Sequence, residues 1–110
     1  LARILVEAKD YEGALNTLQG AMQRGTLNAD FLSLLGAVYQ RLGRYGEAAD
    51  AYRGALQLSP TGSSWVGLGI SLEAAQRRPE AAEAFRRALA SNMLGAELRA
   101  FAESRVRQLQ

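Results

Sequence analysis

Residues 31–60 read FLSLLGAVYQRLGRYGEAADAYRGALQLSP, and the spacing of small and apolar residues within this stretch predicts the fold. In its first half such residues recur three or four positions apart, at Leu32, Leu35, Gly36, Val38, Tyr39 and Leu42. The second half repeats the pattern at Ala48, Ala51, Tyr52, Ala55 and Leu56. This spacing places the side chains on one face of a helix. Because Gly43-Arg44 interrupts the pattern and Pro60 follows it, the stretch predicts two helices.

The pattern recurs along the chain with a nearly constant period. Residues 34 positions apart match as Tyr11 and Tyr45, Ala14 and Ala48, Leu18 and Tyr52, and Ala21 and Ala55. Residues 33 positions apart match as Leu35 and Leu68, Gly36 and Gly69, Ala48 and Ala81, Tyr52 and Phe85, and Ala55 and Ala88. A fixed period of about 20 to 50 residues indicates stacked structural repeats. The break between the two helices of the later unit lies just before Pro79, which suits the first turn of a helix.

The glycines at positions 36 and 69 require a packing reason. A glycine in the middle of a helix costs about 1 kcal/mol relative to alanine. Small side chains at Gly36, Gly69, Ala48 and Ala81 let two antiparallel helices approach closely, which offsets that cost. We expect the aromatic side chain at position 52 or 85 to fill the space between neighbouring pairs.

These residues resemble the tetratricopeptide repeat. The repeat pattern is matched by Leu35-Gly36, Tyr39, Ala48, Tyr52, Ala55 and Pro60, and its first aromatic residue is supplied by Trp65 ahead of Leu68-Gly69 in the next unit. The resemblance covers residues 1 to about 93 and implies an all-α superhelix, a solenoid of antiparallel helix pairs. We expect one domain with a truncated repeat at 1–28, repeats at 29–61 and 62–94, and a capping helix at 95–110. Since Leu1 falls at the seventh position of a repeat, we expect more chain upstream.

The expected capping helix carries an apolar stripe at Leu98, Phe101, Ala102, Val106 and Leu109. Charged residues occupy the rest of it, at Glu97, Arg99, Glu103, Arg105 and Arg107. A terminal repeat helix needs a polar outer face to end the stack in water, and this segment fits that requirement.

Composition narrows the function. The net charge is +2, although 12 of the 13 basic residues are arginine, so the sequence does not imply a nucleic-acid partner. Among the arginines at 77, 78, 86 and 87 stand Glu80 and Glu83, which predicts a solvated helix face held by ion pairs. The alternative is a site for an acidic partner or a phosphate backbone. No stretch is apolar enough to cross a bilayer. The compartment stays open between a bacterial envelope and the cytoplasm.

Nothing in the sequence favours an enzyme. The chain has no Cys and no His, so it lacks thiolate nucleophiles, soft metal sites and the usual general base. Its carboxylates form no persuasive catalytic pair, and Asp10 is better explained as the N-cap of a helix beginning at Tyr11. The glycines of Gly67-x-Gly69 fall inside a helix rather than in a phosphate loop. We expect no cofactor and no metal; a small enzyme or nucleotide binder would need a convergent polar pocket.

The resemblance implies a site for a protein or peptide partner. In this family the first helix of each pair lines a concave groove and contacts the partner at fixed positions. Carried over by position, these are Asp30, Ser33, Leu34, Ala37, Gln40 and Arg41, then Ser63, Val66, Gly67, Ile70, Glu73 and Ala74, with Arg3 and Glu7 from the truncated unit and Arg99 and Glu103 from the last helix. The apolar floor would be Leu34, Ala37, Val66 and Ile70, and the charged rim Arg3, Arg41, Glu73, Arg99 and Glu103. The alternative is that these residues pack against a neighbouring helix or an upstream repeat.

Comparison with two narrower groups within the family bears on which partner this site would bind. One subclass of the family grips a C-terminal carboxylate through Lys, Asn and Arg, but the matching positions hold Ser33, Ala37, Gly67, Ala96 and Ala100. Residues 65–73, 85–89 and 98–101 are similar to the C-terminal repeats of bacterial pilus-biogenesis proteins of the mannose-sensitive haemagglutinin system, over residues 44–110. This implies a scaffold in pilus or secretion-system assembly. A cytoplasmic adaptor of the co-chaperone type, and a homodimer paired through the apolar edge of the truncated first helix, are the alternatives.

Overall fold

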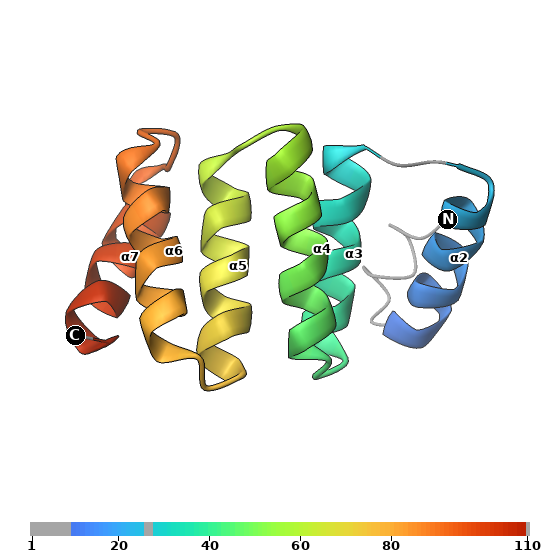
Figure 1. Cartoon of the computed structure of the whole chain (residues 1–110), viewed down its shortest axis with the longest axis horizontal. Coiled ribbons are helices and arrows are strands. Elements are labelled where there is room, and N and C mark those ends of the chain that lie inside the picture. Colours follow the sequence, from blue (N-terminus) through green and yellow to red (C-terminus); the bar gives the residue numbers. More distant parts are fainter. Residues whose placement is uncertain (1–9, 26–27, 110) are drawn as a thin grey trace.

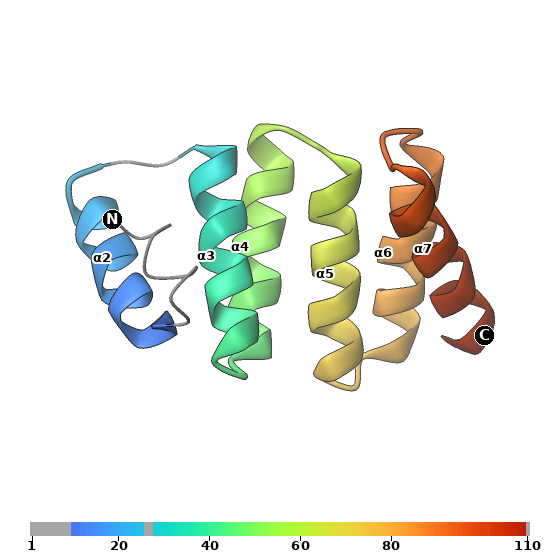
Figure 2. The ribbon, with the colours of Figure 1, turned by 180° about the vertical axis from the view of Figure 1, so that it is seen from behind.

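The computed structural model describes residues 10–25 and 28–109, and in these residues all regular structure is helical. The helices are α2 (Tyr11–Gln23), α3 (Ala29–Arg41), α4 (Tyr45–Leu58), α5 (Gly62–Ala74), α6 (Arg78–Ala90) and α7 (Ala96–Leu109). They stand side by side in a row, each antiparallel to the next (Figures 1 and 2). The predicted fold class, an all-α superhelix, is confirmed.

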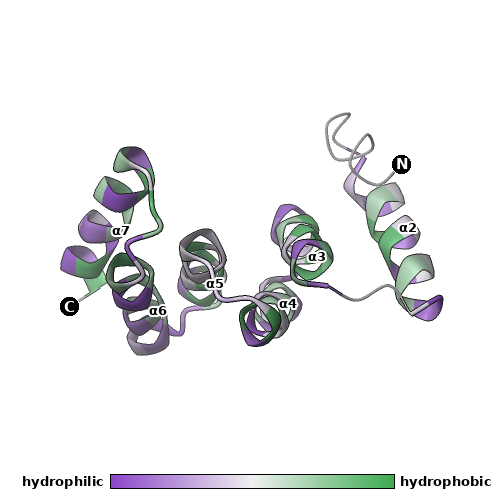
Figure 3. Cartoon of the chain, turned by 90° about the horizontal axis from the view of Figure 1, so that it is seen from above, coloured by the Kyte–Doolittle hydropathy of each residue, from purple (hydrophilic) through white to green (hydrophobic). Residues whose placement is uncertain are grey.

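The helices form two layers. Viewed from above, α3, α5 and α7 lie on one side of the row, and α4 and α6 lie on the other (Figure 3). The pairs α3–α4 and α5–α6 fall within residues 29–61 and 62–94. The exact repeat boundaries stay a prediction, and the apolar edge expected of the first helix lies in residues 1–9, outside the described part.

Local sequence sets the helix ends. Asp10 caps α2 as predicted, since its carboxylate accepts a hydrogen bond from the Gly13 backbone N–H at 3.0 Å. Asn28 and Thr61 cap α3 and α5 in the same way. The turn after α3 needs the left-handed conformation of Gly43, with φ of 76°. Pro79 lies in the first turn of α6, as expected.

The small residues allow the close stacking that the sequence predicts. A Cβ on Gly36 would lie 2.8 Å from the Tyr52 ring, and one on Gly67 would lie 2.5 Å from the same ring. Tyr52 therefore fits between α3 and α5 only because both helices present glycine there. Phe85 occupies the equivalent place in the next repeat, where a Cβ on Gly69 would lie 2.8 Å from its ring.

The last helix is less buried than its apolar stripe suggested. Ala102 and Leu109 are buried and Val106 is partly buried against the core. Leu98 and Phe101 remain 41% and 40% exposed, and the Phe101 ring meets Phe85 edge-on at 5.8 Å between centroids. The stripe was therefore only partly right as a core prediction, because two of its large side chains stay at the surface.

Candidate partner-binding face

The residues predicted to contact a partner come mainly from α3, α5 and α7, whose exposed side forms one face of the molecule (Figure 3). Arg3 and Glu7 lie outside the described residues. The remaining positions divide between two seams, one where α3 meets α5 and one where α5 meets α7. The two seams differ in chemistry.

Hydrogen bonds bridge the α3–α5 seam, and a hollow of about 330 Å³ remains at its Ser33–Ser64 end. The Gln40 side-chain amide donates to the Gly67 carbonyl at 2.9 Å and to the Ser71 hydroxyl at 2.8 Å. Ser33 and Ser64 bond through their hydroxyls at 3.0 Å. Both amide hydrogens of Gln40 are thereby used. Ser33 and Gln40, predicted as partner contacts, therefore hold the two helices together.

The predicted apolar floor loses one member. Val66 is only 4% exposed and packs in the core cluster that contains Tyr52 and Leu56, so including it in the partner site was wrong. The interior takes this side chain because the fifth position of α5 lies in the buried cluster formed by α4, α5 and α6. Leu34 and Ala37 are partly buried, and Ile70 is 37% exposed. The accessible floor is thus Leu34, Ala37 and Ile70.

An open hollow of about 400 Å³ lies in the α5–α7 seam, lined by Ile70, Glu73, Ala74, Phe101 and Arg105. Arg105 pairs with Glu73 through both carboxylate oxygens, with 2.9 Å between Nε and Oε1. Both side chains are mostly buried, at 23% and 29% exposure. Glu73 is therefore not a free rim charge, and the hollow is apolar with a neutral ion pair at its edge.

Phe101 and Arg105 line this hollow, although position alone had selected Arg99 and Glu103. The contacts across this seam are offset by one residue from those across the α3–α5 seam. In the α3–α5 seam, Gln40 bonds Ser71. In the α5–α7 seam the residue equivalent to Gln40, 33 positions later, is Glu73, and it bonds Arg105. Arg105 lies 34 rather than 33 positions after Ser71. The available signal was that Ala100 stands at the position of Gly67, so the packing of the preceding seam did not have to continue.

The other predicted rim residues are open to solvent or loosely held. Arg41 and Glu103 are exposed, and the Arg99 guanidinium donates to the Asn92 side chain at 3.3 Å. Burial raises the pKa of Tyr52, and the positive charge of Arg41 opposes that rise. Arg41 thus offers a positive charge at the C-terminal end of α3.

The described residues offer little for catalysis or metal binding. Over residues 10–25 and 28–109, no three His, Cys, Asp or Glu side chains come together as a metal site. Within the same ranges every buried side-chain nitrogen or oxygen has a hydrogen-bond partner. None of the helices described is long and apolar enough to span a membrane.

Two of the four arginines in this predicted face, Arg77 and Arg87, pair with carboxylates, whereas Arg78 donates to the Gln108 carbonyl at 3.2 Å. Arg77 contacts Glu80 at 3.1 Å and Arg87 contacts Glu83 at 3.8 Å. All four side chains are about half exposed, so these pairs form a solvated face.

This architecture defines a helical repeat protein, and a family model for the tetratricopeptide repeat matches residues 1–63. The chain belongs to the tetratricopeptide repeat family. The Sgt2 TPR domain from Aspergillus fumigatus has the same fold, with a TM-score of 0.86 and 21% identity over 98% of this chain and 74% of that one. The Arabidopsis OM64 TPR domain also has a TM-score of 0.86, with 20% identity over 99% of this chain and 88% of that one. No curated protein matches significantly.

These comparisons bear on function only in general terms. Tetratricopeptide repeat domains mediate protein–protein interactions, and the fold is typically a non-enzymatic interaction module. At about one fifth identity, the two solved structures show the shared fold alone.

Proposed function

We propose that the chain is an interaction module that holds a segment of a partner protein across the face of α3, α5 and α7. The observation that carries the proposal is the α5–α7 hollow, where Ile70 and Phe101 leave 37% and 40% of their surface exposed around about 400 Å³ of open space. Exposed large apolar side chains beside a hollow are the usual mark of a docking site. The partner would place an apolar anchor there.

The chemistry of the hollow defines what the anchor should be. Because Glu73 and Arg105 neutralise each other, a charged anchor would lose hydration without gaining a counter-charge. A buried Leu, Phe or Met side chain contributes about 1.5 to 3 kcal/mol through the hydrophobic effect. Arg41 and Glu103 at the rim would set orientation and specificity more than affinity.

The proposal favours a protein segment over two other kinds of partner and over an enzymatic role. The matching positions lack the Lys, Asn and Arg of the carboxylate-gripping subclass, so a free C-terminal carboxylate is not the anchor. Nucleic acid is disfavoured because the net charge is only +2 and four of the basic side chains of α4 and α6 are paired with carboxylates. An interaction module without catalytic chemistry is what the family typically supplies.

The biological setting rests on sequence resemblance alone. The similarity of residues 44–110 to pilus-biogenesis repeats supports a scaffold in bacterial pilus or secretion-system assembly, and the general family supports a cytoplasmic adaptor. The docking mode is the same in both settings.

The test is a selection of peptides from a random phage-displayed library on the domain, followed by affinity measurement with three variants. Ile70→Glu and Phe101→Glu should each weaken selected peptides by about tenfold or more, since each places a charge in the hollow. Leu58→Glu is the matched control, because Leu58 is 58% exposed at the end of α4 and lies on no part of this face. If the selected peptides bind both hollow variants as well as the wild type, the site is elsewhere.

A further inference from the structure

A second set of hollows lies on the other side of the row, between α4 and α6. Two adjoining hollows of about 360 Å³ each share the residues Arg53, Trp65 and Leu68. One extends toward Pro79, Glu80 and Glu83, and the other toward Leu56 and Gln57. Together they form an apolar depression over Trp65, lined from α4, α5 and α6. The helices α4 and α6 lie on the side of the row opposite to α3, α5 and α7 (Figure 3).

The preceding repeat contains an equivalent hollow of about 300 Å³. Its lining corresponds position by position, with Leu35, Tyr39, Glu47, Asp50 and Ala51 where the later repeat has Leu68, Leu72, Glu80, Glu83 and Ala84. Hollows at this place are therefore a property of the repeat, and only the differences between them can indicate a site.

Three differences are concentrated around Trp65. The preceding repeat has Leu32 at the place of Trp65, Gln19 at the place of Arg53, and Gly54 at the place of Arg87. The tryptophan suits the first aromatic position of the repeat. The two arginines have no such packing reason, because the earlier repeat folds with Gln19 and Gly54 in their places.

Arg87 lies over the tryptophan. Its guanidinium carbon is 5.3 Å from the centroid of the Trp65 ring, within the range of a cation–π interaction. The side chain is 61% exposed and its contact with Glu83 is long, at 3.8 Å. Arg87 can therefore move to meet a ligand without losing a strong ion pair.

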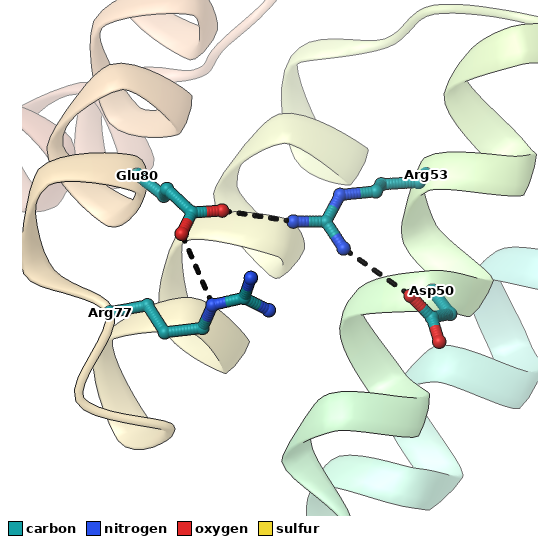
Figure 4. A network of polar contacts seen from close by, with 4 residues as sticks. All are labelled: Asp50, Arg53, Arg77 and Glu80. Atoms are coloured by element: carbon teal, nitrogen blue, oxygen red, sulfur yellow. Dashed lines mark hydrogen bonds and ion pairs between the residues drawn. The ribbon is translucent and has the colours of Figure 1, made fainter.

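Arg53 spans the depression from the opposite side. It reaches from α4 to Glu80 on α6 at 3.4 Å and to Asp50 at 3.3 Å, while Arg77 also bonds Glu80 (Figure 4). These distances are at the outer limit of a hydrogen bond, and the Arg53 side chain is 40% exposed. An incoming carboxylate can replace either contact at little cost, and Glu80 would keep Arg77.

We propose that this depression is a second docking site, for a protein segment in which a large apolar side chain is followed by a carboxylate side chain. The apolar group would lie on Trp65 and Leu68, and the carboxylate between Arg53 and Arg87. Charge places the carboxylate at the Gln57 end of the depression, because that hollow is lined by Arg53 and no acid, whereas Glu80 and Glu83 line the other end. Tryptophan and arginine are also the side chains that most often dominate interface energetics.

The chain provides its own reporter, because Trp65 is its single tryptophan. The probe is a capped synthetic peptide that alternates leucine and glutamate, titrated into the intact chain while tryptophan emission and the indole N–H resonance are followed. We expect saturable shifts of both signals. A leucine–lysine peptide and a serine–glutamate peptide should give none, because each lacks one half of the proposed chemistry.

Variants locate the effect. Arg53→Gln and Arg87→Gln should each weaken binding about fivefold, whereas Arg86→Gln removes the same charge from an exposed neighbouring position and should change it less than about twofold. Ile70→Glu should leave the titration unchanged, which separates this site from the one on the α3, α5 and α7 face. The proposal is overturned by an absent shift, by equal shifts with the lysine peptide, by equal losses in all three arginine variants, or by loss of the shift in Ile70→Glu.

Discussion

The seam between α3 and α5 is closed where Gln40 meets Gly67 and Ser71, although a hollow of about 330 Å³ lies at its Ser33–Ser64 end, and the seam between α5 and α7 is open. In the first, the Tyr52 ring lies against glycine on both sides, at Gly36 of α3 and Gly67 of α5. In the second, Phe85 lies against Gly69 of α5, but its partner on α7 is the ring of Phe101. The two seams are built from equivalent helices, so the difference comes from a few side chains.

The position of Gly67 is taken in α7 by Ala100. A Cβ at Gly67 would come within 2.5 Å of the Tyr52 ring, so the equivalent ring, Phe85, has no room against a helix that carries alanine there. In the last helix Ala100 is exposed, and Phe101 meets Phe85 edge-on. An alanine at this position is therefore incompatible with the contact that Gly67 makes with Tyr52, and the α5–α7 seam contains an exposed apolar hollow instead.

The largest change in stability is expected when Gly67 of the closed seam is replaced by alanine, the residue found at the equivalent position of α7. Gly67→Ala should destabilise the chain by about 1 to 2 kcal/mol, because the overlap with Tyr52 exceeds the gain in helix propensity. Urea unfolding followed by circular dichroism measures the change. Gly46→Ala is the control: no atom lies within 4 Å of its added Cβ, so it should stabilise α4 by about 0.5 to 1 kcal/mol. Equal effects of the two substitutions would contradict the explanation of the seams.

A smaller effect is expected from the polar bridge of the closed seam. Gln40→Ala removes two hydrogen bonds across the seam, while Ser71 keeps its own bond to the Gly67 carbonyl at 3.0 Å. The loss should be about 1 kcal/mol, the usual net value for such bonds when no partner is left unsatisfied. Gln57→Ala, at an exposed position of α4, should cost much less in the same urea measurement. If both glutamine variants unfold at the same urea concentration, Gln40 does not hold the seam.

The Glu73–Arg105 ion pair of the open seam should contribute less to stability than the hydrogen bonds of Gln40. Glu73→Gln removes the negative charge but keeps an acceptor for Arg105, so we expect a loss of about 0.5 to 1 kcal/mol at low salt. Added salt should reduce the difference, since the pair is partly open to solvent. Glu103→Gln, on the exposed side of α7, should be neutral at every salt concentration. A salt-independent loss in Glu73→Gln would mean that shape, rather than charge, matters at this site.

The sequence predicts the regular part of this molecule well because glycine, alanine and aromatic residues at fixed spacing have a direct packing consequence. Gly36, Tyr52 and Gly69 are where the repeat pattern requires them. The repeat pattern does not predict how α7 packs, because Ala100 replaces the glycine found at the equivalent position 67. It also assigned Val66 to the surface, because a position in a family motif does not say which neighbouring ring covers it.

The smallest change in stability is expected at Ile70. Val66, four residues earlier on the same helix, provides the contrasting substitution. Ile70→Thr exchanges an exposed side chain that packs mainly against open space, so the stability change should stay within about 0.5 kcal/mol. Val66→Thr hardly changes the shape of the side chain but places a hydroxyl in the core, and should cost about 1 to 3 kcal/mol. The urea midpoints of both variants measure this directly. Because Ile70→Thr would leave the fold intact, any weakening of a selected peptide by this variant would come from the binding face itself, and a large loss of stability would instead show that Ile70 serves the core.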